Sequence, residues 1–358
     1  MNEIKSKVNR WKSKIGGLFI LSILAVMLYL LFKTHSIDEI RGLLMRMNPL
    51  WLIAALGCVI FSYITEMLSY YELAKKSDSR ANFRTSFKVT MAGQYFNSIT
   101  PFAGGGQPFQ IYYLMQDGIP MGRCANIIIV KSVIYEVAVF LMSVSSFIFN
   151  ARRLNGIIGQ FTLFFTIGVS INLLVIFFFA LFLFNRTAAE KVVNGVFRLL
   201  KWLRIIKDLD KYKKRKETEL DSFLGGSEII FSDIRAIVKS SFFQVLSLLF
   251  IYAIPWFMLV SLEGYKSSFF DIITSQSVLR EITAYIPSPG AAGGAEGISY
   301  FFFYNFFTKS PIVSVILMWR ILTYYLNIVF GGLSLVFIRK KDKKSSEKVV
   351  ESNSAESA

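Results

Sequence analysis

Residues 288–302 read SPGAAGGAEGISYFF, and residues 100–114 read TPFAGGGQPFQIYYL. Both stretches run from a Ser/Thr-Pro pair through a Gly/Ala cluster to a polar residue and then to an aromatic run. Each lies inside a longer apolar stretch, 87–114 or 269–307, and interrupts it, because proline lacks a backbone N–H and glycine weakens a helix. How the chain passes these two interruptions decides its fold.

Six further stretches are apolar over about the 20 residues that a helix needs to cross a bilayer. They are Ile15–Phe32, Leu50–Tyr71, Ala125–Phe149, Gln160–Phe184, Ser240–Leu262 and Ile312–Ile338. The first is expected to be an uncleaved span, because no small-residue cleavage site follows it. A composition that is 54% hydrophobic, with a mean hydropathy of +0.49, is rare in soluble domains. We therefore predict an all-α integral membrane protein with about six full transmembrane helices.

Most of the positive charge lies in four segments. Lys and Arg number five in residues 1–14, five in 72–88, thirteen in 185–239 and six from 339 onward. Basic loops face the cytoplasm. All four segments share that side only if each interrupted stretch enters and leaves the membrane on one face. We predict two re-entrant helical hairpins, the first open to the cytoplasm and the second to the outside, with cytoplasmic N- and C-termini. The alternative at each stretch is an even number of short crossings.

The spans that flank the two hairpins run in opposite directions. The chain passes inward before the first hairpin and outward after it, and passes outward before the second and inward after it. This pattern is an inverted-topology repeat, in which transporters place the substrate site where broken helices meet near mid-membrane. The alternative is a chance likeness between two Pro-Gly breaks, which are common in membrane helices.

Non-helical backbone at membrane depth must be surrounded by protein or by a water-filled cavity, so the glycine clusters should face inward. Half-helix N-termini there would offer free N–H groups and a partial positive charge, which favour an anion such as a lipid phosphate. The predicted substrate-binding residues are Thr100, Pro101, Gly104, Gly105, Gly106, Gln107, Gln110, Pro289, Gly293, Gly294, Glu296 and Arg320.

Charged residues inside a membrane are costly and need partners. Arg320, inside the last span, requires a counter-ion or a phosphate, and Glu296 is the expected partner. Alternatively, Glu296 only stabilises the N-terminus of its half-helix. Lys131 and Glu136 are five residues apart and should not share a helix face. Lys131 is expected to extend to the cytoplasmic surface. The other intramembrane charges are Glu66, Arg280 and Glu281.

Residues 1–340 are predicted to form one membrane domain, with a disordered tail at 341–358. Within it, the basic segment 185–239 contains an amphipathic stretch, 191–216, that should lie on an anionic lipid surface. No nucleic-acid-binding signature is present, so no nucleic acid partner is expected. Two cysteines and a single histidine give no zinc cluster or disulfide framework, and no metal, cofactor or catalytic residue is expected.

Three motifs carry a family resemblance: FNSITPFAGGGQPFQIYYL (96–114), IPSPGAAGGAEG (286–297) and WRILTYYLNIVFGG (319–332). Together they resemble the lysylphosphatidylglycerol synthase transmembrane-region family, also called the flippase-like domain family, over most of the chain. The resemblance implies a bacterial inner-membrane protein that handles phospholipids. In the synthases, this region is similar to a flippase that moves aminoacylated phosphatidylglycerol outward and so confers resistance to cationic peptides.

In those synthases a separate C-terminal cytosolic domain transfers lysine from lysyl-tRNA. This chain ends 20 residues after Ile338, so we expect that domain to be absent. Three functions follow as alternatives: a phospholipid flippase or transporter, a phosphatidylglycerol lysyltransferase, or a non-catalytic membrane partner of a separate lipid-modifying enzyme. Only the family name supports the transferase, because the sequence shows no tRNA-binding domain, nucleotide loop or nucleophile–base pair.

Overall fold

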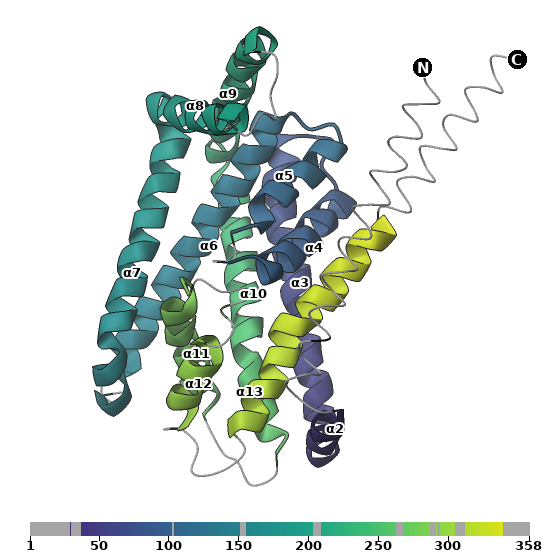
Figure 1. The fold of residues 1–358 in the computed structure, drawn as a ribbon, viewed down its shortest axis with the longest axis vertical. Coiled ribbons are helices and arrows are strands. Elements are labelled where there is room, and N and C mark those ends of the chain that lie inside the picture. The colour runs from purple at the N-terminus through teal and green to yellow at the C-terminus, as the bar shows by residue number, and fades with distance from the viewer. Residues whose placement is uncertain are drawn as a thin grey trace, which may run out of the picture.

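The computed structural model describes residue 29 and residues 37–101, 104–150, 155–202, 209–262, 268–286, 291, 294–304 and 312–338, and this part of the chain consists of helices joined by short turns and loops (Figure 1). Its helices are α2 (Ile37–Arg46), α3 (Pro49–Ser77), α4 (Phe83–Ile99), α5 (Gly106–Gln116), α6 (Met121–Asn150), α7 (Asn155–Phe184), α8 (Arg186–Trp202), α9 (Leu209–Phe231), α10 (Ile234–Val260), α11 (Phe269–Thr283), α12 (Gly294–Tyr304) and α13 (Ile312–Arg320). After α13 the helix continues through a π-helical turn, η3 (Ile321–Tyr325), to Ile338.

Five helical segments of the described chain are long and apolar enough to cross a membrane. They are Pro49–Ser77, Met121–Phe149, Phe161–Phe184, Ile234–Val260 and Ile312–Ile338, hereafter the C-terminal span. They match five of the six predicted spans, and the sixth, Ile15–Phe32, lies outside the described residues. The chain is therefore an all-α, multi-pass membrane protein.

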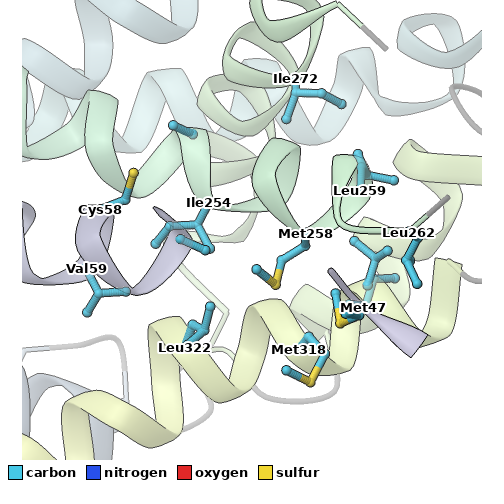
Figure 2. Close-up of a cluster of buried hydrophobic side chains, with 14 of the residues drawn as sticks. Met47, Cys58, Val59, Ile254, Met258, Leu259, Leu262, Ile272, Met318 and Leu322 are labelled. Carbon is cyan, nitrogen blue, oxygen red and sulfur yellow. The ribbon is translucent and has the colours of Figure 1, made fainter. Parts of the chain in front are cut away.

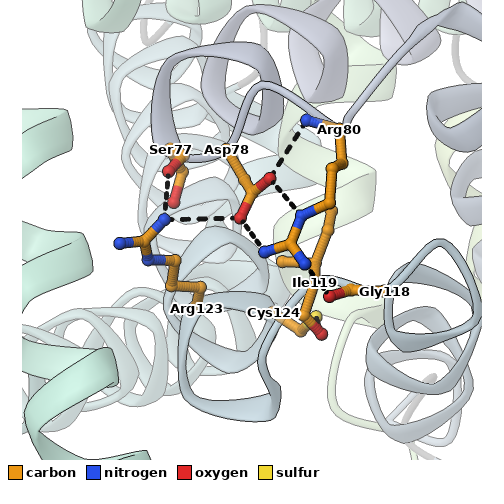
Figure 3. A network of polar contacts seen from close by, with 7 residues as sticks. All are labelled: Ser77, Asp78, Arg80, Gly118, Ile119, Arg123 and Cys124. Carbon is orange, nitrogen blue, oxygen red and sulfur yellow. Dashed lines mark hydrogen bonds and ion pairs between the residues drawn. The ribbon is translucent and has the colours of Figure 1, made fainter.

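Helices α4 and α5 form the first hairpin. Helix α4 begins with a capping box, in which Asn82 accepts a hydrogen bond from the backbone of Thr85, and it ends at the Thr100-Pro101 pair. The network in Figure 3 joins the two ends of the hairpin: Asp78 before α4 contacts Arg80 at 2.7 Å and Arg123 of α6 at 3.3 Å. The hairpin therefore enters and leaves at one end of the bundle, as predicted.

Helices α11 and α12 form the second hairpin at the opposite end of the bundle (Figure 1). Helix α11 begins at Ser268, whose side chain caps it, shortly after α10 ends. At this end the backbone N–H of Asn48 donates to the carbonyl of Ser261 at 2.8 Å, which ties the start of α3 to the end of α10. The two hairpins thus enter from opposite ends, and the predicted inverted arrangement is observed.

The centre of the bundle is the antiparallel pair α3 and α10, which share the most extensive interface of the described helices. Small polar residues allow close approach: Ser69 and Ser240 lie 2.8 Å apart, and Ser247 donates to the carbonyl of Ser62 at 3.0 Å. Nearer the second hairpin, Ile254 and Met258 of α10 pack with residues of α3, α11 and the C-terminal span (Figure 2).

The basic segment forms α8 and α9 at the same end as the mouth of the first hairpin. Helix α8 lies across the end of α7, as an interfacial helix would (Figure 1). The second half of α9 lies beyond the predicted amphipathic stretch 191–216 and packs on α6: Asn126 donates to Ser227 at 2.6 Å, and Phe223 and Ile230 are buried. The side chains of residues 196–216 and the tail 341–358 lie outside the described part.

Candidate functional site

Both hairpins pack against the C-terminal span. In the first hairpin, α4 approaches Gly331 so closely that a Cβ there would lie 2.9 Å from the Cβ of Tyr95 and 3.1 Å from the carbonyl of Met91. In the second, α12 packs against α13. Between the two contacts lies the π-helical turn η3, directly after Arg320. Such turns are frequent at functional sites, where they open the hydrogen-bond ladder of a helix locally.

Arg320 and Glu296 form the polar centre of this region. Nε of Arg320 lies 2.5 Å from Oε1 of Glu296, which is in the first turn of α12. The guanidinium also lies 5.0 Å from the ring centroid of Tyr324 and 5.5 Å from that of Trp319. Only 8% of the Arg320 side chain is exposed, against 38% of Glu296. The predicted ion pair is confirmed, and of its two groups the Glu296 carboxylate is the more exposed.

The tip of the first hairpin is closed by its own side chains. The backbone N–H of Gly105 donates to the Thr100 hydroxyl at 3.0 Å, and that of Gly106 donates to Oδ1 of Asn97 at 2.9 Å. Pro108 has no N–H to offer. The expectation that these glycine N–H groups are open to an anion is therefore wrong at this hairpin, because Asn97 and Thr100 cap the half-helix internally.

The other predicted site residues fall into four groups. Gln107 donates to Ser132 of α6 at 3.2 Å, and buried Gln110 donates to the Tyr70 hydroxyl at 2.8 Å, so both hold the hairpin against its neighbours. Pro101 and Gly104 are exposed at the first tip. Half-buried Gly294 begins α12 against Ile286. Pro289 and Gly293 lie outside the described residues.

A first cluster of intramembrane charges lies beside the first hairpin. Lys131 is 2% exposed, donates to Oε1 of Gln244, and lies 4.6 Å from the ring centroid of Tyr70. Glu66 accepts a hydrogen bond of 2.5 Å from Gln94 and attracts the Lys131 ammonium. The expectation that Lys131 extends to the membrane surface is wrong, because these partners hold it inside the bundle.

A second cluster lies where α6, α7 and α11 meet. Arg280 donates to the Tyr135 hydroxyl from Nε at 3.1 Å and from Nη2 at 2.7 Å. Glu136 accepts from Asn172 at 3.0 Å. Glu281, which is fully buried, accepts from Ser143 at 3.2 Å. Sequence reasoning named these charges singly. The signal that could have indicated a cluster was the adjacent pair Arg280 and Glu281, because each charged side chain inside a membrane needs compensating partners.

The chain resembles one known family over most of its length. The model of a family described as lysylphosphatidylglycerol synthase TM region matches residues 15–331. A UPF0104 membrane protein of Archaeoglobus fulgidus is 25% identical over 336 residues, covering 92% of this chain and 98% of that protein. The UPF0104 membrane protein MJ1595 of Methanocaldococcus jannaschii is 26% identical, covering 91% of this chain and 95% of that protein.

An uncharacterized MG306 homolog of Mycoplasma pneumoniae is 19% identical, covering 90% of this chain and 86% of that protein. No solved structure matches the chain. The names of these relatives state membrane location at most, so the family and the geometry of the site are what a functional argument can use.

Proposed function

Because the chain belongs to the lysylphosphatidylglycerol synthase transmembrane-region family, we propose that it moves an anionic phospholipid between the leaflets of its membrane. The substrate class is phosphatidylglycerol, aminoacylated phosphatidylglycerol or a related lipid with a phosphate headgroup. The observation that supports this most directly is the Glu296–Arg320 ion pair, which joins the second hairpin to the C-terminal span.

The proposed step is an exchange of anions at Arg320. A guanidinium inside a bilayer needs a counter-ion and binds phosphate as well as carboxylate. Glu296 lies on the short α12, and its side chain is partly exposed. An entering lipid phosphate would displace the Glu296 carboxylate and take its place on Arg320. The π-helical turn that follows Arg320 lets the local helix adjust as the partner changes.

The headgroup would pass along the tips of the hairpins. At the first tip, Pro101 and Gly104 are the exposed predicted residues, whereas Gln110 and the capped Gly105 and Gly106 support the hairpin. A path of this kind lets the polar headgroup avoid the hydrocarbon while the acyl chains remain in it. The orientation in the membrane follows from the end of the bundle that carries the mouth of the first hairpin and the basic helix α8. This end would face the cytoplasm of an inner membrane and contact its anionic lipid surface.

The test is lipid translocation in proteoliposomes that contain a fluorescent phosphatidylglycerol. Wild-type protein is expected to move the lipid at least about tenfold faster than empty vesicles, and Arg320→Ala and Glu296→Ala are expected to remove most of that gain, since a lost charge-assisted contact changes a rate by about tenfold for each 1.4 kcal/mol. Arg320→Lys keeps the charge but not the planar fork and should be intermediate.

The matched control is Lys239→Ala, which removes an exposed charge that lies 3.9 Å from Glu72 and should leave the rate unchanged. Wild-type rates equal to those of empty vesicles, or full activity in both Arg320→Ala and Glu296→Ala, would contradict the proposal.

A further inference from the structure

The second cluster of intramembrane charges is not balanced. Its charged members are two carboxylates, Glu136 and Glu281, and one guanidinium, Arg280. With both acids ionised, these three groups carry one net negative charge. The first cluster, by contrast, pairs one carboxylate, Glu66, with one ammonium, Lys131. An uncompensated carboxylate in a low-dielectric interior is strongly unfavourable, which makes the neutral acid the favoured form.

The described groups that face the second cluster do not supply the missing positive charge. Helix α6 contributes Tyr135 and Glu136, α7 contributes the neutral Asn172, and α10 contributes the neutral Tyr252. Beyond them, on α12 and α13, Glu296 and Arg320 neutralise each other. Counted over these described groups alone, the cluster therefore keeps one net negative charge.

Several buried polar atoms at this cluster make no hydrogen bond within the described structure. They include Oε1 of Glu281, a residue with 0% exposure, Oδ1 of Asn172, and the hydroxyl of Tyr252, which is 2% exposed and electrostatically coupled to Arg280 and both acids. The guanidinium of Arg280 donates its hydrogen bonds to Tyr135 rather than to either carboxylate. Glu281 is thus the more deeply buried of the two acids, and one of its carboxylate oxygens lacks a hydrogen bond.

We propose that this cluster is a proton-binding site, with Glu281 as the group that takes up and releases one proton. In the proton-loaded form, Glu281 is a neutral carboxylic acid, and Arg280 balances Glu136. On release, the O–H bond of Glu281 breaks, the proton passes to water, and the carboxylate keeps the electron pair.

The position of the cluster links the proton to movement of the second hairpin. Arg280 and Glu281 lie on α11, whereas Tyr135 and Glu136 lie on α6. A displacement of α11 relative to α6 separates Arg280 from Tyr135 and admits water to Glu281, which then ionises. Resting on the proposed function, this makes lipid movement proton-coupled, because the hairpin that carries Glu281 also carries Glu296.

The first test is infrared spectroscopy of the purified protein in lipid nanodiscs, read by the carboxylic-acid C=O band and its shift on H/D exchange. We expect one such buried band at neutral pH in the wild type. It should disappear in Glu281→Gln. It should disappear in Glu136→Gln as well, because one carboxylate then balances one guanidinium. In Arg280→Gln both acids lose their counter-charge, and a second band is expected.

The matched control is Glu66→Gln, which removes a charge-balanced acid and should leave the band unchanged. Absence of a buried C=O band in the wild type, or its survival in Glu281→Gln, would overturn the proton site. These outcomes need no lipid movement, so they are independent of the proposed function.

The second test imposes a pH gradient across the proteoliposomes. The translocation rate should change by up to about tenfold per pH unit if one proton is exchanged in the rate-limiting step, and Glu281→Gln should abolish that dependence. A wild-type rate that ignores the gradient overturns the coupling, even where the C=O band is present. If the buried C=O band is present but the protein moves no lipid, the proton site is supported and the proposed function is refuted.

Discussion

The two hairpins share an architecture and differ in how completely their polar groups are partnered. In the first, side chains cap Gly105 and Gly106, and Asp78 holds the mouth closed with Arg80 and Arg123. At the mouth and on α4 of the first hairpin, the described structure leaves the buried hydroxyls of Ser77, Ser86 and Thr90 without hydrogen bonds. In and around the second hairpin, the set of such atoms is larger and includes a carboxylate oxygen: Gln276 Nε2, the Ser277 hydroxyl, Glu281 Oε1, the Tyr285 hydroxyl, the Ser299 hydroxyl and Trp319 Nε1.

This difference indicates a division of labour. Buried polar groups with fixed partners rigidify a structure, whereas buried groups without partners are costly in any one conformation. We infer that the first hairpin is a fixed support against the C-terminal span and that the second is the part that moves. The following predictions test this inference.

The largest effect is expected where the first hairpin meets the C-terminal span. Gly331→Leu would force its side chain into Tyr95 and the backbone of Met91, which a Cβ alone already approaches to 2.9 and 3.1 Å. We expect a loss of about 3 kcal/mol in the free energy of unfolding, as in overpacked cores, measured as a fall in the thermal midpoint in detergent. Gly57→Leu on α3 is the control, because no heavy atom lies within 4 Å of its Cβ position. Equal shifts in both variants would rule out a tight support.

A smaller stability effect is expected at the second hairpin, although the steric conflict there is worse. A Cβ at Gly168 of α7 would lie 2.6 Å from the carbonyl oxygen of Glu281, closer than the 2.9 Å contact at Gly331. If both hairpins were equally rigid, Gly168→Ala would destabilise the protein more than Gly331→Ala. We expect Gly168→Ala to lower the thermal midpoint less than Gly331→Ala, because α11 can shift away from the added methyl group. The expected loss in the free energy of unfolding for Gly168→Ala is about 1 kcal/mol. A larger loss in Gly168→Ala would contradict the assignment of the second hairpin as the moving part.

Much of the fold could be predicted from the sequence, because bilayer thickness and loop charge are local signals. The described spans follow directly from apolar length, and the two re-entrant hairpins follow from Pro-Gly breaks combined with the positions of Lys and Arg. The π-helical turn at Ile321–Tyr325 could not be predicted, since nothing in that stretch distinguishes it from an ordinary α-helix.

The site was predictable only in part, since burial depends on helices that are distant in sequence. The Glu296–Arg320 pair was predictable, because an unpaired charge inside a membrane is unfavourable and these two side chains have opposite charges. The burial of Lys131 was not, because Gln244, its hydrogen-bond partner, is 113 residues away. The second charge cluster likewise requires α6, α7 and α11 to converge, which no local pattern specifies.

At the mouth of the first hairpin a moderate, pH-dependent effect is expected. The hydrogen bond from Arg80 lowers the pKa of Asp78 from 3.8 to about 2. Because the pKa is lowered on folding, the stabilisation is complete above about pH 4 and is lost as the pH falls toward about 2. With discount for the exposed Arg80, we expect Asp78→Asn to cost about 1 kcal/mol near neutral pH and progressively less in acid.

Thermal midpoints of the wild type and Asp78→Asn, compared at about pH 6 and about pH 3, measure this effect. Asp221→Asn is the control, because its ion pair with Arg186 is about 60% exposed on both sides and should contribute little. A difference between the wild type and Asp78→Asn that does not shrink in acid would show that the Asp78 network does not hold the mouth.

The smallest effect is expected at the tips. Ala291, in the second tip, has a φ of +55°, which costs an L-residue about 1–2 kcal/mol. Ala291→Gly relieves this strain but gives the unfolded chain more conformational freedom. We therefore expect a net gain of about 0.5 kcal/mol in the free energy of unfolding, measured as a rise in the thermal midpoint. At the first tip, Gly104 has open space around its Cβ position, and Gly104→Ala should stabilise the protein by a similar amount through the unfolded chain alone. Both substitutions would thus raise the stability, Ala291→Gly by releasing backbone strain in the folded protein and Gly104→Ala by restricting the unfolded chain. A fall in the midpoint of Ala291→Gly would mean that the second tip stores no strain, and that its readiness to move must come from the unbalanced charge at Glu281 alone.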